Sequence, residues 1–196
     1  MKNDKESILF ARNYVHDLIK TLQALPLANL SKAIEVLKSA YGKRKQVFLA
    51  GNGGSAATAS HMANDLVKGV AKNGAHGFRA IALSDNIPLI TAIANDENYD
   101  EIFASQLKEL AQPGDVLIVF SGSGQSPNIV RAVEMAAKMK LKTVAFLGMG
   151  GGRVAKMADV SVIVPSDDYG PIEDIHLTFD HLMTAYFRKW VGEKNF

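Results

Sequence analysis

The sequence predicts an α/β protein, a three-layer αβα sandwich around a five-stranded parallel sheet, with additional N-terminal helices. The first reason is that short apolar segments alternate with amphipathic helical patterns from residue 46 onward, as in repeated βα units. The second is that glycine- and serine-rich turns follow three of these segments. These turns lie at the carboxyl ends of the strands, and parallel sheets bind ligands at this edge, where the strand order reverses. Right-handed crossovers then place helices on both faces of the sheet.

Two helical patterns precede this alternation. Residues 4–24 carry one apolar stripe, made of Ile8, Ala11, Val15, Leu18, Ile19 and Leu22. Pro26 ends this helix, and a second one is expected over 27–41. Because neither belongs to a βα unit, they either cover the sheet of their own chain or form a seam between subunits. We expect one domain over 1–196, with the helices of 1–42 as a candidate oligomer interface.

The remaining elements follow in order. The expected strands are 46–50, 78–83, 115–120, 143–147 and 160–164. The expected helices are 55–72, 88–95 with 100–111, 126–140, 152–157 and 171–191. No internal repeat or linker interrupts this pattern.

Composition limits the partners and the compartment. The 22 Lys and Arg residues against 20 Asp and Glu give a formal charge of +2, too small to indicate nucleic acid or an anionic membrane. The absence of cysteine excludes disulfides and thiolate metal sites. No apolar run approaches the ~20 residues that span a bilayer, and we expect no signal peptide. We therefore expect a cytoplasmic protein.

The segment FSGSGQSPN predicts an anion site. Its hydroxyls, Ser121, Ser123 and Ser126, are separated by glycines and precede a helix, whose N-terminus attracts anions. The loop has no Lys or Arg, unlike a P-loop, which favours a phosphomonoester over a triphosphate. The alternative is a turn whose serines cap the helix, but one cap needs one serine.

The turn GNGGS over 51–55 also follows an apolar segment. Gly53 and Gly54 would let the backbone approach a ligand and present N–H groups to it. Nucleotide binding is disfavoured because the turn lacks the GxGxxG pattern and its later acidic residue. The glycines of GMGGG over 148–152 are interpreted as residues that allow a tight turn, rather than as a third phosphate site.

Ionisable residues occur on two predicted helices. His61 and Asp65 are four positions apart, so they can share a metal or a proton, and small apolar neighbours argue against a plain surface pair. The last helix carries Glu173, Asp174, His176, Asp180 and His181. The acids near its start also stabilise the helix N-terminus. Its two histidines are about 140° apart around the helix, so one at most faces a given site.

Taken together, these segments resemble the SIS (sugar isomerase) family, and within it the phosphoheptose isomerases. The matching segments are 51–61, 89–96, 113–132, 164–168 and 172–181, and the resemblance covers essentially the whole chain. It implies a flavodoxin-like SIS fold and a homotetramer with sites at subunit interfaces. It also implies conversion of sedoheptulose 7-phosphate to D-glycero-D-manno-heptose 7-phosphate, a precursor of lipopolysaccharide or capsule heptose.

The resemblance assigns residues to this reaction. Phosphate would be bound by Ser121, Gly122, Ser123 and Ser126, and the sugar by Asn52, Gly53, Gly54, Ser55 and Asp96. One zinc per chain would be held by His61, Asp65, Glu173 and His181. Asp65 or Glu173 would be the base that forms an enediol, and His181 the acid.

This chain departs from the family pattern at several positions. Asp65 replaces a glutamate, Glu173 replaces a glutamine, and Gly122 stands where a threonine is usual. The segment DYGP at 168–171 lacks the usual polar or basic residue, which affects substrate identity. Two non-catalytic alternatives are a protein-interaction module of the replication-initiator-associating type and a phosphosugar sensor. A site with four ionisable groups favours the enzyme.

Overall fold

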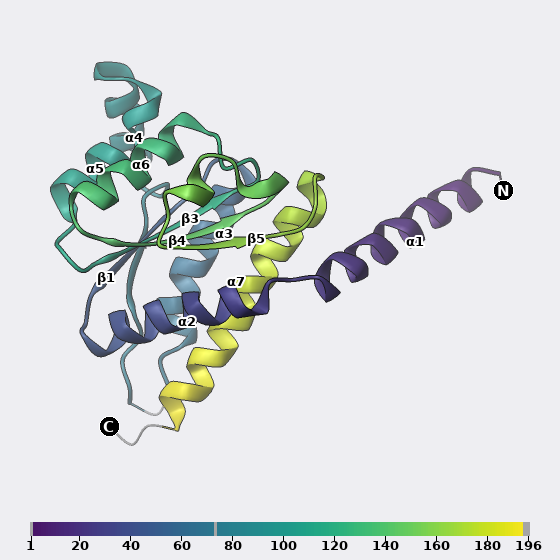
Figure 1. Ribbon diagram of the computed structural model, residues 1–196, viewed down its shortest axis with the longest axis horizontal. Coiled ribbons are helices and arrows are strands. Elements are labelled where there is room, and N and C mark those ends of the chain that lie inside the picture. Colours follow the sequence, from purple (N-terminus) through teal and green to yellow (C-terminus); the bar gives the residue numbers. More distant parts are fainter. Residues whose placement is uncertain (1, 73, 194–196) are drawn as a thin grey trace.

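The computed structural model describes residues 2–72 and 74–193, with a five-stranded parallel sheet at its centre (Figure 1). The strands are β1 (Gln46–Ala50), β2 (Arg79–Ala82), β3 (Val116–Ser121), β4 (Lys142–Leu147) and β5 (Val160–Ile163). Their order is β2-β1-β3-β4-β5, and every neighbouring pair is parallel. The predicted fold class is confirmed, and the order reverses between β1 and β3.

Helices cover both faces of the sheet. One face packs against α2 (Leu27–Gly42), α3 (Gly54–Asn64) and α7 (Tyr169–Gly192). The other packs against α4 (Ile87–Asp96), α5 (Ala104–Leu110) and α6 (Pro127–Lys138). Alternate residues of β1 enter the two cores, Val47 and Leu49 on one side and Phe48 and Ala50 on the other. The central strands β1 and β3 are therefore almost wholly apolar and buried, as expected for a parallel sheet, whereas the edge strand β2 exposes Arg79 and Ile81.

Three expected helices differ in detail from prediction. The helix expected over 55–72 ends as an α-helix at Asn64 and continues as a π-helix, η1 (Asp65–Gly69). There the Val70 N–H donates to the Asp65 carbonyl, 3.0 Å away. The region 100–111 divides into the 3₁₀ turn η2 (Tyr99–Glu101) and α5. The region 152–157 contains the 3₁₀ turn η4 (Val154–Lys156) and directly follows another 3₁₀ turn, η3 (Met149–Gly151).

The two N-terminal helices behave differently. α2 packs on the sheet, and its Asn29 side chain donates to the Ser161 carbonyl at 2.8 Å. By contrast, α1 (Lys2–Gln23) projects away from the sandwich (Figure 1). Several of its apolar side chains are exposed, among them Phe10 at 73%. The Tyr14 hydroxyl ties α1 to α7 by donating to the Asp174 carboxylate at 2.5 Å.

Among the described helices, none has an apolar stretch long enough to cross a membrane.

A histidine is buried in the core under α7. His176 is 1% exposed, and its ring lies 5.6 Å from that of Phe120, centroid to centroid. Burial lowers the pKa of His176 to about 4, and neither ring nitrogen has a hydrogen-bond partner among the described residues. The folded protein therefore holds this imidazole neutral at neutral pH.

This burial predicts an acid sensitivity. Between the ordinary pKa of 6.5 and the folded value of about 4, the unfolded chain binds a proton that the folded one does not. Stability therefore falls as the pH drops through this window, by roughly 3 kcal/mol in total. We expect His176→Leu to remove that part of the difference in unfolding free energy between pH 7 and pH 4.5, measured with urea. The exposed His16→Leu is the control, and an equal effect of both variants would contradict the assignment.

Candidate active site

A pocket of about 160 Å³ opens at the carboxyl edge of the sheet, beside the point where the strand order reverses. It is lined by the turn after β1, the loop after β3 and the first turn of α7. The lining residues are Asn52, Ser55, Phe120, Ser121, Gly122, Ser123, Ser126, Tyr169 and Glu173. Six residues expected at the phosphate and sugar are thus brought together from separate parts of the chain.

The serine loop is held in a fixed shape by its own hydroxyls. Ser121 Oγ accepts from the Gly124 N–H at 3.1 Å, and Ser123 Oγ accepts from the Gln125 N–H at 3.2 Å. Gly124 has a φ of +60°, and a Cβ there would lie 2.1 Å from the Gly151 carbonyl oxygen. Only glycine fits this turn, because φ and space both exclude a side chain.

A pair of amides joins the two loops. Asn52 and Asn128 exchange hydrogen bonds in both directions, at 2.9 and 2.8 Å between amide nitrogen and oxygen. Asn128 is buried at the start of α6, and sequence reasoning did not identify it. Its position just after Ser-Pro at a helix start was the available signal. The pair fixes the GNGGS turn relative to the serine loop.

The pocket suits an anion without using a cationic side chain. None of the described residues that line it is a lysine or arginine. α3 and α6 begin at its rim, and the first N–H groups of a helix point outward and favour negative charge. Ser126 precedes α6 but makes no capping hydrogen bond through its side chain. Its hydroxyl is therefore not required as a cap.

Glu173 lies over the start of α3. A Cβ added to Gly54 would lie 2.5 Å from Glu173 Oε2, so the absence of a side chain there makes room for the carboxylate. Since Glu173 also lines the pocket, it is placed to contact whatever extends from a bound anion. Gly53, the residue before α3, has a φ of +53°, which favours glycine.

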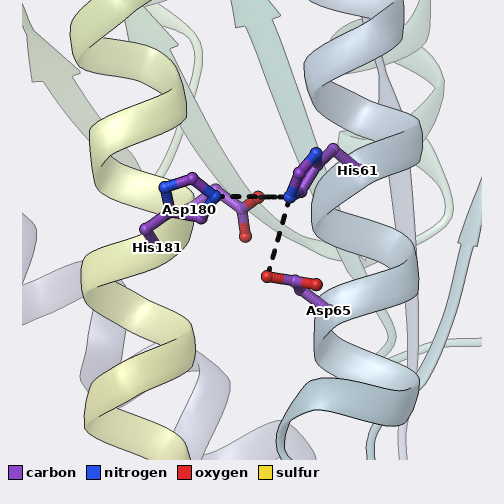
Figure 2. A group of neighbouring side chains, drawn as sticks. All are labelled: His61, Asp65, Asp180 and His181. Carbon is purple, nitrogen blue, oxygen red and sulfur yellow. Dashed lines mark hydrogen bonds and ion pairs between the residues drawn. The ribbon is translucent and has the colours of Figure 1, made fainter.

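A second group of side chains lies farther along the same two helices (Figure 2). His61 and Asp65 come from α3 and the start of η1, and Asp180 and His181 come from α7. The His61 Nε2 atom is 3.3 Å from His181 Nε2 and 3.8 Å from both Asp65 Oδ2 and Asp180 Oδ2. One ligating atom from each residue lies within 4.8 Å of the others. Imidazole and carboxylate donors at this spacing fit a divalent metal.

Asp180 is the buried member of this group. Its side chain is fully buried, and its Oδ2 atom has no hydrogen-bond partner. Its Oδ1 accepts from the Thr184 hydroxyl at 3.3 Å. Burial and the nearby Asp65 raise the pKa of Asp180 to about 6, against the opposing effects of His61 and His181. Sequence reasoning noted Asp180 without giving it a role.

Two expected site residues lie elsewhere. Glu173 was expected to share a metal with His61, Asp65 and His181, but it is not in their group. It is already inside the regular helix α7, and the eight positions to His181 correspond to ~12 Å along the axis. Asp96 was expected at the sugar, but it is exposed at the end of α4, on the opposite face of the sheet, and does not line the pocket.

Tyr169 explains why residue 122 is a glycine. A Cβ at Gly122 would lie 2.7 Å from Tyr169 Cε1. Tyr169, which is 55% exposed, thus occupies the space that a threonine side chain would need, and it also lines the pocket. The departures from the family pattern at 122 and in the DYGP segment are therefore linked, because the tyrosine ring occupies the space next to the glycine.

Comparison with known proteins identifies the family and related structures. The family model described as SIS domain matches residues 12–148. Phosphoheptose isomerase of Nitratiruptor sp. is 43% identical over 152 residues, covering 78% of this chain and 79% of the relative. That of Geotalea daltonii is 38% identical over 160 residues, covering 82% and 83%. The solved structure of a phosphoheptose isomerase from Francisella tularensis matches with a TM-score of 0.86 at 30% identity, covering 96% of this chain and 99% of that one.

The contact between Gly122 and Tyr169 predicts a coupled pair. Gly122→Thr should destabilise the protein by about 1 kcal/mol, because the new side chain displaces the tyrosine ring. In a Tyr169→Ala background the same change should cost much less. Urea unfolding of the four proteins gives the coupling energy directly. Additive effects would show that the two positions do not meet.

Proposed function

This chain belongs to the SIS-domain family, and we propose that it is an aldose–ketose isomerase acting on a phosphorylated heptose. The leading reaction is the conversion of sedoheptulose 7-phosphate to D-glycero-D-manno-heptose 7-phosphate. The observation that carries the proposal is that an anion pocket lies where α3 and α7 begin, and an ionisable group lies farther along the same two helices. We further propose a cytoplasmic location.

The spacing of the two sites suits a long, open-chain substrate. Glu173 lines the pocket with Gly54 beside it, and His61 and His181 lie seven and eight residues farther along the two helices from Gly54 and Glu173. This corresponds to roughly 10–12 Å along the helix axes. An extended seven-carbon chain with a terminal phosphate ester spans on the order of 10 Å, given bonds of about 1.5 Å. With the phosphate in the serine loop, carbons 1 and 2 reach the ionisable group.

The reaction then requires a base and an acid at that end. Asp65 is partly exposed and belongs to the group, so it is placed to remove the proton next to the carbonyl, which gives an enediol. His181 is placed to supply and accept the proton on the oxygen. Glu173, between the two sites, is placed to accept hydrogen bonds from the sugar hydroxyls, and it remains the alternative base.

We propose zinc as the metal, one per chain, with His61, Asp65 and His181 among its ligands. Imidazole and carboxylate are common zinc ligands. When bound, the metal supplies Lewis-acid polarisation of the substrate oxygen.

We also propose that 1–196 forms one domain and that four copies assemble through residues 1–42. The support is α1, which projects from the sandwich and exposes Ile8, Leu9, Phe10, Val15 and Ile19, while Leu18 and Leu22 near its end pack against the core. Such a surface is typical of an interface. Asp96 would then enter a site only from another copy.

The activity has a direct test. Purified protein incubated with sedoheptulose 7-phosphate should yield an aldose phosphate, detected by NMR. We expect His181→Gln to lower kcat by 10²- to 10⁴-fold, as is typical for loss of an acid–base group, while calorimetry still shows substrate binding. A phosphosugar sensor would bind the substrate but show no turnover even in the unchanged protein.

The serine loop is tested by a second variant, Ser123→Ala, which should weaken substrate binding. Failure of Ser123→Ala to weaken binding would contradict the role of the serine loop.

The assembly has a separate test. By light scattering, the unchanged protein should have the mass of four chains, and Phe10→Asp should shift it to smaller species, because a charge would be buried in the seam. The exposed polar change Asn13→Asp is the control. A monomeric unchanged protein would contradict the proposal.

A further inference from the structure

The group between α3 and α7 contains one more carboxylate than catalysis needs. Asp65 is partly exposed and can meet a substrate, whereas Asp180 is fully buried against the helix interface. Its Oδ2 atom is therefore not exposed at the surface that a substrate would contact. The buried position of the Asp180 carboxylate therefore points to a binding partner located among the four side chains of the group.

Within the part of the chain that the structure describes, nothing satisfies this oxygen by a hydrogen bond. Asp180 Oδ1 accepts from Thr184, which fixes the carboxylate plane, and Oδ2 then points toward His61. A buried carboxylate without a partner is costly, and proteins retain one mainly where a cation meets it. The neighbours facing it are His61, Asp65 and His181.

The spacing matches a tetrahedral cation site. Ligand bonds of about 2.0–2.1 Å in a tetrahedron separate the ligand atoms by roughly 3.3–3.4 Å. The separations from His61 Nε2 are 3.3 Å to His181 Nε2 and 3.8 Å to each carboxylate oxygen, and the remaining pairs lie within 4.8 Å, so a small inward shift of the side chains would complete the tetrahedron. Asp180 and the two neutral imidazoles would hold the cation, and Asp65, the exposed carboxylate on the side open to substrate, completes the charge balance of a divalent cation.

We propose that Asp180, rather than Glu173, is the buried anionic ligand of the metal in this chain, which leaves Glu173 free to face the sugar. This deepens the proposed function, on which it rests for the identity of the bound metal. Glu173 cannot take both positions, because its carboxylate lies beside Gly54 at the start of α3. His61 is seven residues, ~10 Å, farther along that helix.

Zinc affinity, measured by competition with a coloured chelator, tests this without any substrate. Asp180→Asn keeps the shape of the side chain and should weaken zinc binding by at least 100-fold. Glu173→Gln, the matched control, should change it by less than threefold. His61→Ala is the positive control and should abolish binding. Loss of zinc in Glu173→Gln with retention in Asp180→Asn would overturn the proposal.

A second measurement avoids the risk that Asp180→Asn fails to fold. Crystals of the unchanged protein grown with zinc, with data collected at the zinc absorption edge, locate the ion directly. We expect the peak within bonding distance of Asp180 Oδ2. A peak bonded to Glu173 instead, or no peak, would overturn the proposal. The isomerase assay is independent of both measurements, so a failure of the metal assignment is distinguishable from a failure of the activity.

Discussion

The parallel packing of α3 against α7 determines where the chemistry lies. Both helices begin at the carboxyl edge of the sheet and run along the same face, in a register that can be followed contact by contact. Gly54 meets Glu173 at the start, His61 meets His181 in the middle, and the Gly69 carbonyl accepts from Arg188 Nε at 2.7 Å near the end. A glycine at the first of these positions lets the two helices begin close together. This register determines which residue of α3 each candidate site residue of α7 faces.

The sheet and the serine loop were accessible from sequence because their signals are local. Apolar segments such as 46–50 and 143–147 have the length of buried strands, and the loops after β1 and β3 must meet once the sheet is parallel. The ends of helices were less accurate. The π-helical turn at Asp65 lies where this segment packs against α7 and β2, and no local sequence pattern predicted it.

The composition of the ionisable group was only partly predictable. His61 and Asp65 follow from spacing on one helix, but the choice between Glu173 and Asp180 depends on which turn of α7 lies opposite them. That choice is set by packing between distant segments. Tyr169 and Gly122 illustrate the same limit, since each was noted separately and only the fold shows that one excludes a side chain at the other.

The pocket with no lysine or arginine among its described lining residues has a consequence for selectivity. In the proposed function, backbone dipoles and hydroxyls would bind the phosphoryl group without contacting the sugar attached to it. Binding energy gained at a pocket remote from the reacting carbons orients those carbons and does not distinguish one carbohydrate from another. If the proposed function holds, sugars of different length would be distinguished by the distance between the phosphate pocket and the ionisable group, which the packing of α3 against α7 keeps constant.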